Sequence, residues 1–258
     1  MEVCMWDPAQ YLAFSDHRAR PFHELVARIG AFEPRAVVDL GCGPGNLTAV
    51  LADRWPRARL EALDSSAEMV EEARRRGIPA EVMDVAGWRP KPDTDVVVCN
   101  AVLQWVPGHA DLLRAWLDEL PSGAWFAWQV PGNFDAPSHV ILRELATTPR
   151  WNDSLGSALR DEQPVHTAHE YACLLAEAGW HADVWETTYQ QRLSGDDPVL
   201  DWVVGTALRP VRAALSDGDW AAFLTELAPR LRAAYPQSAD GSTWFPFRRI
   251  FAVGQKPA

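Results

Sequence analysis

Residues 35–46 read RAVVDLGCGPGN, and this stretch decides the fold. Its first six residues form a short β-branched run, which is typical of a buried strand. Gly41, Gly43 and Gly45 follow at once, and residues 46–54 then carry leucine and valine at helical spacing. A strand, a glycine-rich turn and a helix in this order predict one unit of an α/β sheet, whose turn lets the backbone approach a ligand closely.

The alternation of strand and helix continues through the first half of the chain. Ser65 and Glu68 have the spacing of a capping box, and the helix that they begin ends at Gly77. Repeated strand–helix units predict a parallel sheet with helices on both faces, and the continuous apolar runs AVVDL and VVVC agree. We expect the further strands of this half at residues 60–63, 80–83, 95–99 and 124–130.

The second half departs from this rhythm. Residues 131–165 are rich in Pro, Asn, Ser and Asp, and residues 195–245 hold two or three helices. Thr167 and Glu170 form a second capping box, opening a helix that ends at Gly179. We expect strands at residues 183–190 and 250–253, the last one short and antiparallel.

These elements predict a Rossmann-like α/β fold with about seven strands and helices on both faces. There is no clean linker, so we expect a single domain over residues 1–258. In such folds ligands bind in the crevice at the carboxyl ends of the strands. We predict that helical insertions near residues 131–165 and 195–245 form a lid over that crevice.

Composition and charge exclude several kinds of partner. Lys plus Arg is 24 and Asp plus Glu is 35, so the net charge of −11 would repel a nucleic acid backbone. The sequence contains no run of 18 apolar residues, so we expect no membrane span. Its first residues lack the pattern of a secretion signal. The four cysteines lie far apart, which indicates a reducing cytoplasm. His166 and His169 have no neighbouring cysteine, so we predict no metal site.

Acidic residues end three successive strands and point to the ligand. In the GxGxG turn, Asn46 stands where a dinucleotide-binding turn has its third glycine. Asp39 would repel a pyrophosphate, whereas it would attract the ammonium and sulfonium groups of S-adenosylmethionine. Asp64 can accept both ribose hydroxyls, and Asp84 can accept the adenine amino group. The structural alternative is that Asp64 and Asp84 only cap the helices that follow them.

Four segments carry a resemblance: VVDLGCGPGN, EALDSS, MDVAGW and CNAVLQWV resemble class I S-adenosylmethionine-dependent methyltransferases. Four others, WDPAQYLAFSDHRARP, NAVLQWVPGH, QVPGNFDAPSH and DWVVGTALRP, are similar to the trans-aconitate 2-methyltransferase family. The resemblance covers nearly the whole chain, including both insertions. It implies methyl transfer to a carboxylate of trans-aconitate or a similar small polycarboxylate, giving a monomethyl ester.

The candidate site residues fall into two groups. A carboxylate is already ionised at pH 7, so we expect no catalytic residue, only positioning. For the arginines and Trp105, surface ion pairs and core packing are the structural alternatives. The expected cofactor-binding residues are Asp39, Gly41, Gly43, Gly45, Asp64, Ser65, Asp84, Val85, Asn100 and Tyr11. The expected substrate-binding residues are Arg20, Gln104, Trp105, Arg209 and Arg249.

Other functions remain open at this stage. The acceptor could be a malonyl thioester carboxyl, or a carbon or nitrogen nucleophile that needs a base such as His17, His109 or His139. A non-catalytic S-adenosylmethionine-binding protein is a second alternative. An NAD-dependent oxidoreductase is a third, which Asn46 and Asp39 disfavour. The expected partner is a small carboxylate, with no membrane and no nucleic acid, and the chain is expected to be a monomer.

Overall fold

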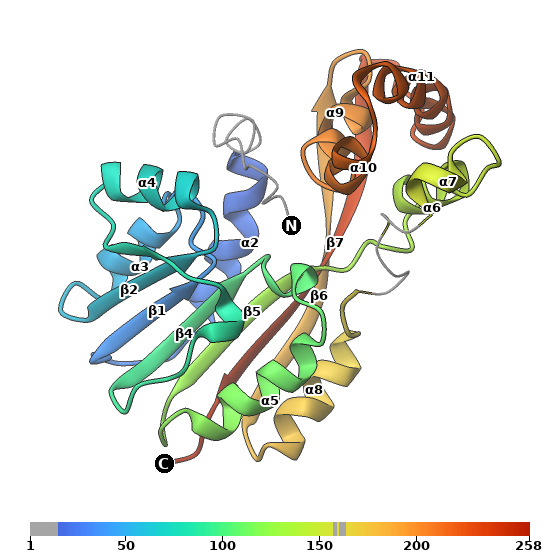
Figure 1. The fold of residues 1–258 in the computed structure, drawn as a ribbon. Coiled ribbons are helices and arrows are strands. Elements are labelled where there is room, and N and C mark those ends of the chain that lie inside the picture. The colour runs from blue at the N-terminus through green and yellow to red at the C-terminus, as the bar shows by residue number, and fades with distance from the viewer. Residues whose placement is uncertain (1–14, 157–158, 160–163) are drawn as a thin grey trace. The chain divides into compact units, whose positions relative to one another are not determined.

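The structure, a computed structural model, describes residues 15–156, 159 and 164–258. These residues form a seven-stranded sheet with the order β3-β2-β1-β4-β5-β7-β6 (Figure 1). Strands β1 to β5 are joined by parallel pairings, and β7 runs antiparallel to β5. The sheet confirms the predicted fold class, including the antiparallel last strand. The strands are β1 (Ala36–Leu40), β2 (Arg59–Asp64), β3 (Ala80–Val82), β4 (Thr94–Asn100), β5 (Trp125–Pro131), β6 (His181–Ser194) and β7 (Ser242–Gln255).

Helices cover both faces of the sheet, as the alternating side chains of β5 show. Phe126 and Trp128 face one side, where they contact Trp116 and Tyr171 with ring centroids 5.8 and 5.5 Å apart. Trp125 faces the other side, where it lies against Gly30. The helices and 3₁₀ turns that border this sheet are α2 (Ser15–Ala27), α3 (Thr48–Arg54), α4 (Ala67–Arg75), α5 (His109–Glu119), α8 (Ala168–Glu177), η1 (Val85–Gly87) and η2 (Leu103–Trp105).

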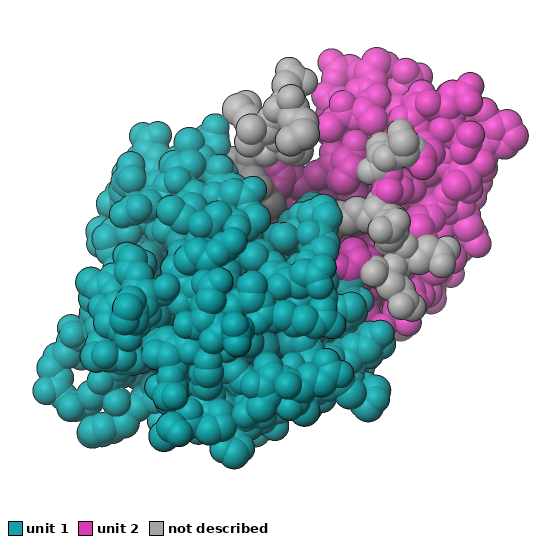
Figure 2. Space-filling view, turned by 60° about the horizontal axis from the view of Figure 1, so that its bottom comes forward, with its two compact units in different colours: residues 1–131, 165–187, 249–258 teal, residues 132–164, 188–248 magenta. Residues whose placement is uncertain are grey.

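The chain divides into two compact units. The first comprises Met1–Pro131, Val165–Thr187 and Arg249–Ala258, and the second comprises Gly132–Pro164 and Thr188–Arg248 (Figure 2). The second unit includes most of the two segments for which we predict insertions. The single domain with a lid stays a prediction. The helices of the second unit are α6 (Pro137–Ala146), α7 (Asn152–Leu155), α9 (Pro198–Val204), α10 (Arg209–Ala214) and α11 (Asp217–Ala234).

Inside the second unit, α6 packs against α11. The backbone N–H of Ser138 donates to the hydroxyl of Tyr235 over 3.1 Å, which ties the start of α6 to the residue after α11. The rings of Trp151 and Phe223 meet edge to face, with centroids 5.3 Å apart. This unit therefore has an apolar core of its own.

The last strand is much longer than predicted. β7 spans 14 residues, Ser242–Gln255, where we expected a strand only over residues 250–253. Pro246 obscured the pattern, because proline cannot donate to a strand ladder and argues against a strand in a sequence. The structure accommodates it on the exposed side of an alternating stretch in which Phe245 and Phe247 are buried.

The capping box predicted at Ser65 and Glu68 is wrong, and a single N-cap one residue later takes its place. Ser66, not Ser65, caps α4: its hydroxyl oxygen accepts the N–H of Met69 over 3.3 Å. The shift occurs because Asp64 Oδ1 accepts the N–H of Ser66, and this side-chain turn makes Ser65 the link between strand and helix. The second predicted box, Thr167 with Glu170 at the start of α8, is confirmed.

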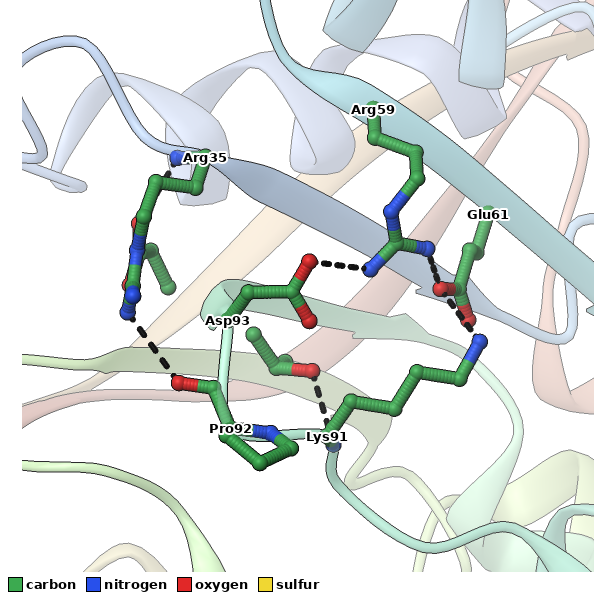
Figure 3. Close-up of polar contacts among 8 residues, drawn as sticks. Arg35, Arg59, Glu61, Lys91, Pro92 and Asp93 are labelled. Atoms are coloured by element: carbon green, nitrogen blue, oxygen red, sulfur yellow. Dashed lines mark hydrogen bonds and ion pairs between the residues drawn. The ribbon is translucent and has the colours of Figure 1, made fainter.

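Many of the charged side chains form ion pairs at the amino ends of the strands. Figure 3 shows Arg59 between Asp93, at 2.7 Å, and Glu61. Lys91 Nζ lies 2.8 Å from Glu61 Oε1, and Arg35 Nη2 donates to the carbonyl oxygen of Pro92 over 3.2 Å (Figure 3). Arg35, Arg59 and Lys91 thus lie at the edge opposite the carboxyl ends of β1, β2 and β4. Across the described part of the chain, no helix has the length and apolar character needed to cross a membrane.

Candidate active site

The glycine turn after β1 lies between two other strand ends. The N–H groups of Gly41 and Cys42 donate to the carbonyl oxygen of Leu63, over 2.7 and 2.9 Å. Gly41 has φ +78°, and a Cβ there would come within 2.1 Å of Val102 Cγ2 in the loop after β4. Only glycine permits both the backbone conformation and this close approach.

Gly43 differs from Gly41 in its surroundings. It has φ +55°, but a Cβ added to it would have no described heavy atom within 4 Å. Its N–H donates to Asp64 Oδ2 over 2.9 Å. The turn therefore leaves an open approach to its backbone at Gly43, as a bound ligand requires. Gly45, with φ +77°, packs instead against Ala73 and Ile78.

Asp39 is a buried acid, with 2% of its surface exposed. Thr48 Oγ1 donates to Asp39 Oδ2 over 2.6 Å. Burial raises the pKa of Asp39 to about 7; the hydrogen bond from Thr48 opposes this, and the charge of Asp64 adds to it. The hydrogen bond from Thr48 does not offset the cost of burying the charged carboxylate, as the raised pKa indicates. A cationic ligand would therefore stabilise the charged form of Asp39.

Asp64 is half-buried and already accepts two backbone hydrogen bonds. Its Oδ2 accepts from Gly43 and its Oδ1 from Ser66, both over 2.9 Å. Burial raises its pKa, and the hydrogen bonds from Ser66 and Gly43 oppose the shift. A carboxylate has about four acceptor positions, so two remain for a ligand such as a pair of hydroxyl groups. Ser65, beside it, is exposed.

Asp84 matches the structural alternative more closely. It is exposed, and its Oδ1 accepts the N–H of Ala86 over 2.9 Å at the start of η1. Val85, in the same turn, is buried. Asp84 thus caps a 3₁₀ turn with one oxygen, and its role toward adenine stays a prediction.

A row of polar side chains crosses the face opposite Phe126 and Trp128. Asp39 of β1 pairs with Val98 of β4, and Asn100 stands two residues further along the same face. Asn100 is in register with Gln129 of β5. Gln129 Nε2 donates to Asn100 Oδ1 over 2.7 Å, and Arg249 Nη1 of β7 donates to Gln129 Oε1 over 3.1 Å. The row therefore ends in an acid on one side and a buried guanidinium on the other.

Gln129 is a residue that we did not predict. The available signal was a single amide within the apolar run AWFAWQV. Burying an amide is costly unless it is hydrogen-bonded, so such a residue indicates a polar partner on a neighbouring strand. Gln129 is 1% exposed and has two partners, Asn100 and Arg249.

The loop after β4 is held in an uncommon conformation. Ala101 has φ +58°, which L residues other than glycine rarely adopt. Its N–H donates to the backbone oxygen of Gln129 over 2.9 Å, and its carbonyl accepts Gln104 Nε2 over 2.6 Å. Gln104 is 8% exposed, so it supports the backbone of the loop that follows Asn100.

The remaining candidates lie in different places. Arg20 forms the surface ion pair of the structural alternative, with its Nε 2.8 Å from Glu24 Oε1. Trp105 is 37% exposed in η2. Arg209 is half-buried at the start of α10, in the second unit. Tyr11 lies outside the described residues. Substrate binding by these residues stays a prediction.

The histidines and cysteines near the sheet are engaged in packing. His109 Nε2 lies 2.9 Å from the hydroxyl of Tyr171, and burial lowers the pKa of His109. Burial raises the pKa of the thiols of Cys42 and Cys99, so neither is a ready nucleophile. In residues 15–156, 159 and 164–258, no group of three or more His, Cys, Asp or Glu side chains could hold a metal ion.

Comparison with known sequences identifies close relatives. Residues 14–183 match the family described as a methyltransferase domain. A protein named trans-aconitate 2-methyltransferase from Rhodococcus jostii (strain RHA1) is 63% identical over 252 residues, covering 97% of this chain and 99% of the relative. A protein of the same name from Mycolicibacterium gilvum (strain PYR-GCK) is 57% identical, with the same coverage. One from Mycobacterium tuberculosis (strain ATCC 25177 / H37Ra) is 56% identical and covered over 97% of its length.

Comparison with solved structures supports the fold. The YcgJ protein from Bacillus subtilis has a TM-score of 0.56 at 14% identity, covering 94% of this chain and 99% of that chain. Phosphoethanolamine N-methyltransferase 2 from Haemonchus contortus, in complex with phosphomonomethylethanolamine and S-adenosylhomocysteine, has a TM-score of 0.53 at 13% identity. It covers 93% of this chain and 53% of that chain. At such low identity the likeness concerns the fold alone.

Proposed function

The chain belongs to the trans-aconitate 2-methyltransferase family, and from this premise we propose that it transfers a methyl group from S-adenosylmethionine to a carboxylate of trans-aconitate. The product would be a monomethyl ester. The similarity supports the substrate as well as the reaction, because it extends over 97% of this chain and 99% of the relative from Rhodococcus jostii.

The observation that carries the cofactor assignment is the arrangement of acids around the glycine turn. Asp39 is buried, and among the described side chains Thr48 is its hydrogen-bond donor, while Asp64 has acceptor positions left beside Gly43. These groups accept hydrogen bonds and attract cations. They fit a ligand with an ammonium group and ribose hydroxyls better than a pyrophosphate, which would be repelled by Asp39.

In the proposed reaction the protein positions the two reactants and transfers no proton. When bound, S-adenosylmethionine would supply a sulfonium methyl group to a carboxylate oxygen of the acceptor and would leave as S-adenosylhomocysteine. The acceptor is ionised at neutral pH, since the pKa of a carboxyl group is about 4. The chain must hold the oxygen in line with the methyl group and exclude water.

We propose that Gln104, Trp105 and Arg209 bind the substrate. Gln104 and Trp105 follow the strained residue Ala101, and Arg209 supplies a guanidinium from the second unit. A trianionic substrate favours arginine, which can bind a carboxylate through two hydrogen bonds. We also propose that the helical insertions near residues 131–165 and 195–245 form a lid that excludes water. We further propose a cytoplasmic monomer; Cys42, Cys99 and Cys173 are free thiols, as a reducing compartment requires.

The experiment that tests this function uses S-adenosylmethionine labelled in its methyl group. The purified protein is incubated with trans-aconitate and, separately, with cis-aconitate, citrate and isocitrate, and the products are treated with mild base. Release of labelled methanol, strongest with trans-aconitate, is the expected result, because a methyl ester is hydrolysed. Label that survives base would replace the carboxylate by a carbon or hydroxyl acceptor. No transfer to any of these acids would overturn the proposed substrate.

The proposed reaction needs no general base, and this predicts a flat pH profile for kcat. With both substrates saturating, kcat should change by less than about twofold between pH 6 and 8, because the nucleophile is ionised throughout. The measurement is kcat at half-unit pH steps in buffers of constant ionic strength. A tenfold rise centred near pH 6.5 would indicate a histidine base and contradict the mechanism.

A further inference from the structure

A chain of three side chains runs across the carboxyl end of the sheet. Arg249 Nη1 donates to Gln129 Oε1 over 3.1 Å, and Gln129 Nε2 donates to Asn100 Oδ1 over 2.7 Å. Gln129 is 1% exposed and Arg249 is 6% exposed, whereas Asn100 at the end of β4 is half-buried. The order is therefore a buried cation, a buried amide and an amide that solvent or a ligand can reach.

The chemistry of arginine determines how both amides are oriented. A guanidinium has only donors, so the atom of Gln129 that faces Arg249 must be its oxygen. The nitrogen of Gln129 then faces Asn100, which must offer its oxygen. This leaves Asn100 Nδ2, with two protons to donate, as the reachable end of the chain. Within the described residues, Asn100 Nδ2 has no hydrogen-bond partner.

The charges along this row separate two kinds of ligand group. Asp39, on the same face of β1, accepts hydrogen bonds and attracts cations. Asn100 donates, and the positive charge of Arg249 polarises the hydrogen bonds behind it. A cationic group is therefore favoured toward Asp39, and a carboxylate oxygen toward Asn100.

We propose that Arg249 and Gln129 are positioning residues, which hold the Asn100 amide so that its Nδ2 donates to a carboxylate oxygen of a bound ligand. The inference rests on the proposed function, because both the substrate and the amino-acid end of the cofactor carry carboxylates. It replaces direct substrate contact by Arg249 with an action through Gln129. Gln129 also holds the loop, since its backbone oxygen accepts the N–H of Ala101 over 2.9 Å.

Gln129→Glu tests the orientation with almost no change of shape. A carboxylate at this position would accept from both Arg249 and Asn100, so the Asn100 amide would turn and present its oxygen to the ligand. Binding of the carboxylate should then weaken at least tenfold. The matched controls are two variants of Arg249. Arg249→Lys keeps a donor-only group, so its Kd for the carboxylate ligand should stay within threefold of the wild-type value. Arg249→Met removes the donor, so its Kd should rise by more than threefold. If Gln129→Glu does not fold, the comparison of Arg249→Lys with Arg249→Met tests the positioning role instead.

Three ligands distinguish the source of the carboxylate. The measurements are calorimetric Kd values for S-adenosylhomocysteine, for methylthioadenosine, which lacks the amino-acid end, and for trans-aconitate in the presence of S-adenosylhomocysteine. A loss confined to S-adenosylhomocysteine assigns Asn100 to the cofactor carboxylate. A loss confined to trans-aconitate assigns it to the substrate. Either result supports the proposal, and Gln129→Glu combined with Asn100→Ala should then bind no worse than Asn100→Ala alone.

Two results would overturn the proposal. One is unchanged binding of all three ligands by Gln129→Glu; the other is equal weakening of all three, methylthioadenosine included, which indicates general damage to the site. Binding is measured without turnover, so the outcome is separate from that of the labelling experiment. A wild-type protein that methylates no acid, but whose S-adenosylhomocysteine affinity depends on residue 129, would fail the proposed function and keep this inference.

Discussion

At the scale of the residue, Asp39 near the end of β1 shows how burial changes the charge of an acid. Asp39 is buried, and burial raises its pKa from the ordinary value of 3.8 to about 7. Its folded-state pKa is raised, so its contribution to stability is complete below about pH 4 and is lost as the pH rises toward 7. At neutral pH the ligand-free protein thus carries an unfavourable acid whose charge a cationic cofactor can use.

Asp39→Asn should raise the unfolding free energy of the ligand-free protein and lower its affinity for S-adenosylmethionine. The amide is neutral at every pH, so the ligand-free variant should exceed the wild type in unfolding free energy at pH 8, by an amount on the order of 4 kcal/mol, and by much less at pH 4. Its affinity for S-adenosylmethionine should fall at least tenfold. In the wild type that affinity should rise with pH from 5.5 to 7, and in the variant it should not. Denaturant unfolding and calorimetry at each pH provide the measurements; a variant less stable at pH 8 would contradict the assignment.

Asp64 and Asp84 form a matched pair. Asp64→Ala should weaken cofactor binding by about 1–3 kcal/mol, because charge-assisted hydrogen bonds to the ligand are lost. Asp84→Ala should cost less, since Asp84 is exposed and caps η1. Titration calorimetry with S-adenosylhomocysteine compares the two. Equal affinity of Asp64→Ala and wild type would remove Asp64 from the site.

At the scale of the element, glycine is needed at two positions of the turn between β1 and α3 for different reasons. Gly41 is confined by Val102, while Gly43 borders open space. Both have positive φ, which costs an alanine roughly 1–2 kcal/mol. Packing therefore requires glycine at position 41, whereas at position 43 the proposed approach of the cofactor would favour it.

Substitution of these two glycines should separate folding from binding. Gly41→Ala should lower Tm by more than Gly43→Ala, because its Cβ would also meet Val102 Cγ2 at 2.1 Å. Gly43→Ala should fold, yet lose most of the rise in Tm that S-adenosylhomocysteine gives the wild type. Thermal unfolding with and without ligand measures both effects. A full ligand-induced rise in Gly43→Ala would show that the cofactor does not approach this backbone.

At the scale of the whole molecule, a net charge of −11 opposes a substrate with three negative charges. Several of the cations are consumed in ion pairs at the amino ends of the strands, such as Arg59 with Asp93 (Figure 3). The long-range field thus repels the proposed substrate and attracts the cationic cofactor, whatever the local contacts are.

The two ligands should therefore respond to salt in opposite directions. Raising KCl from 20 to 200 mM shortens the screening length to below about 10 Å, so kcat/KM for trans-aconitate should rise severalfold. The affinity for S-adenosylmethionine should fall over the same range. Initial rates and calorimetry in one buffer measure both. A fall in kcat/KM for trans-aconitate would mean that local arginines outweigh the overall charge.

The strands of the first half, the glycine turn and the acids near the strand ends could be predicted from the sequence. These are local properties: an apolar run, a glycine spacing and an acid at a strand terminus are each readable within about ten residues. The same holds for the Thr167 capping box. The sequence predictions were wrong where two neighbouring residues, Ser65 and Ser66, could each cap the same helix. They were also wrong where Pro246 interrupts the alternating pattern of β7.

The contacts among the buried polar side chains could not be predicted from the sequence, because they depend on strand order. Asn100, Gln129 and Arg249 are joined by hydrogen bonds, although Gln129 and Arg249 are 120 residues apart in the chain. Their contact depends on the pairing of β5 with β7, an antiparallel neighbour that arrives from the end of the chain. Strand order and register arise from the packing of the whole sheet, so the orientation of the Asn100 amide could not be derived from any single segment.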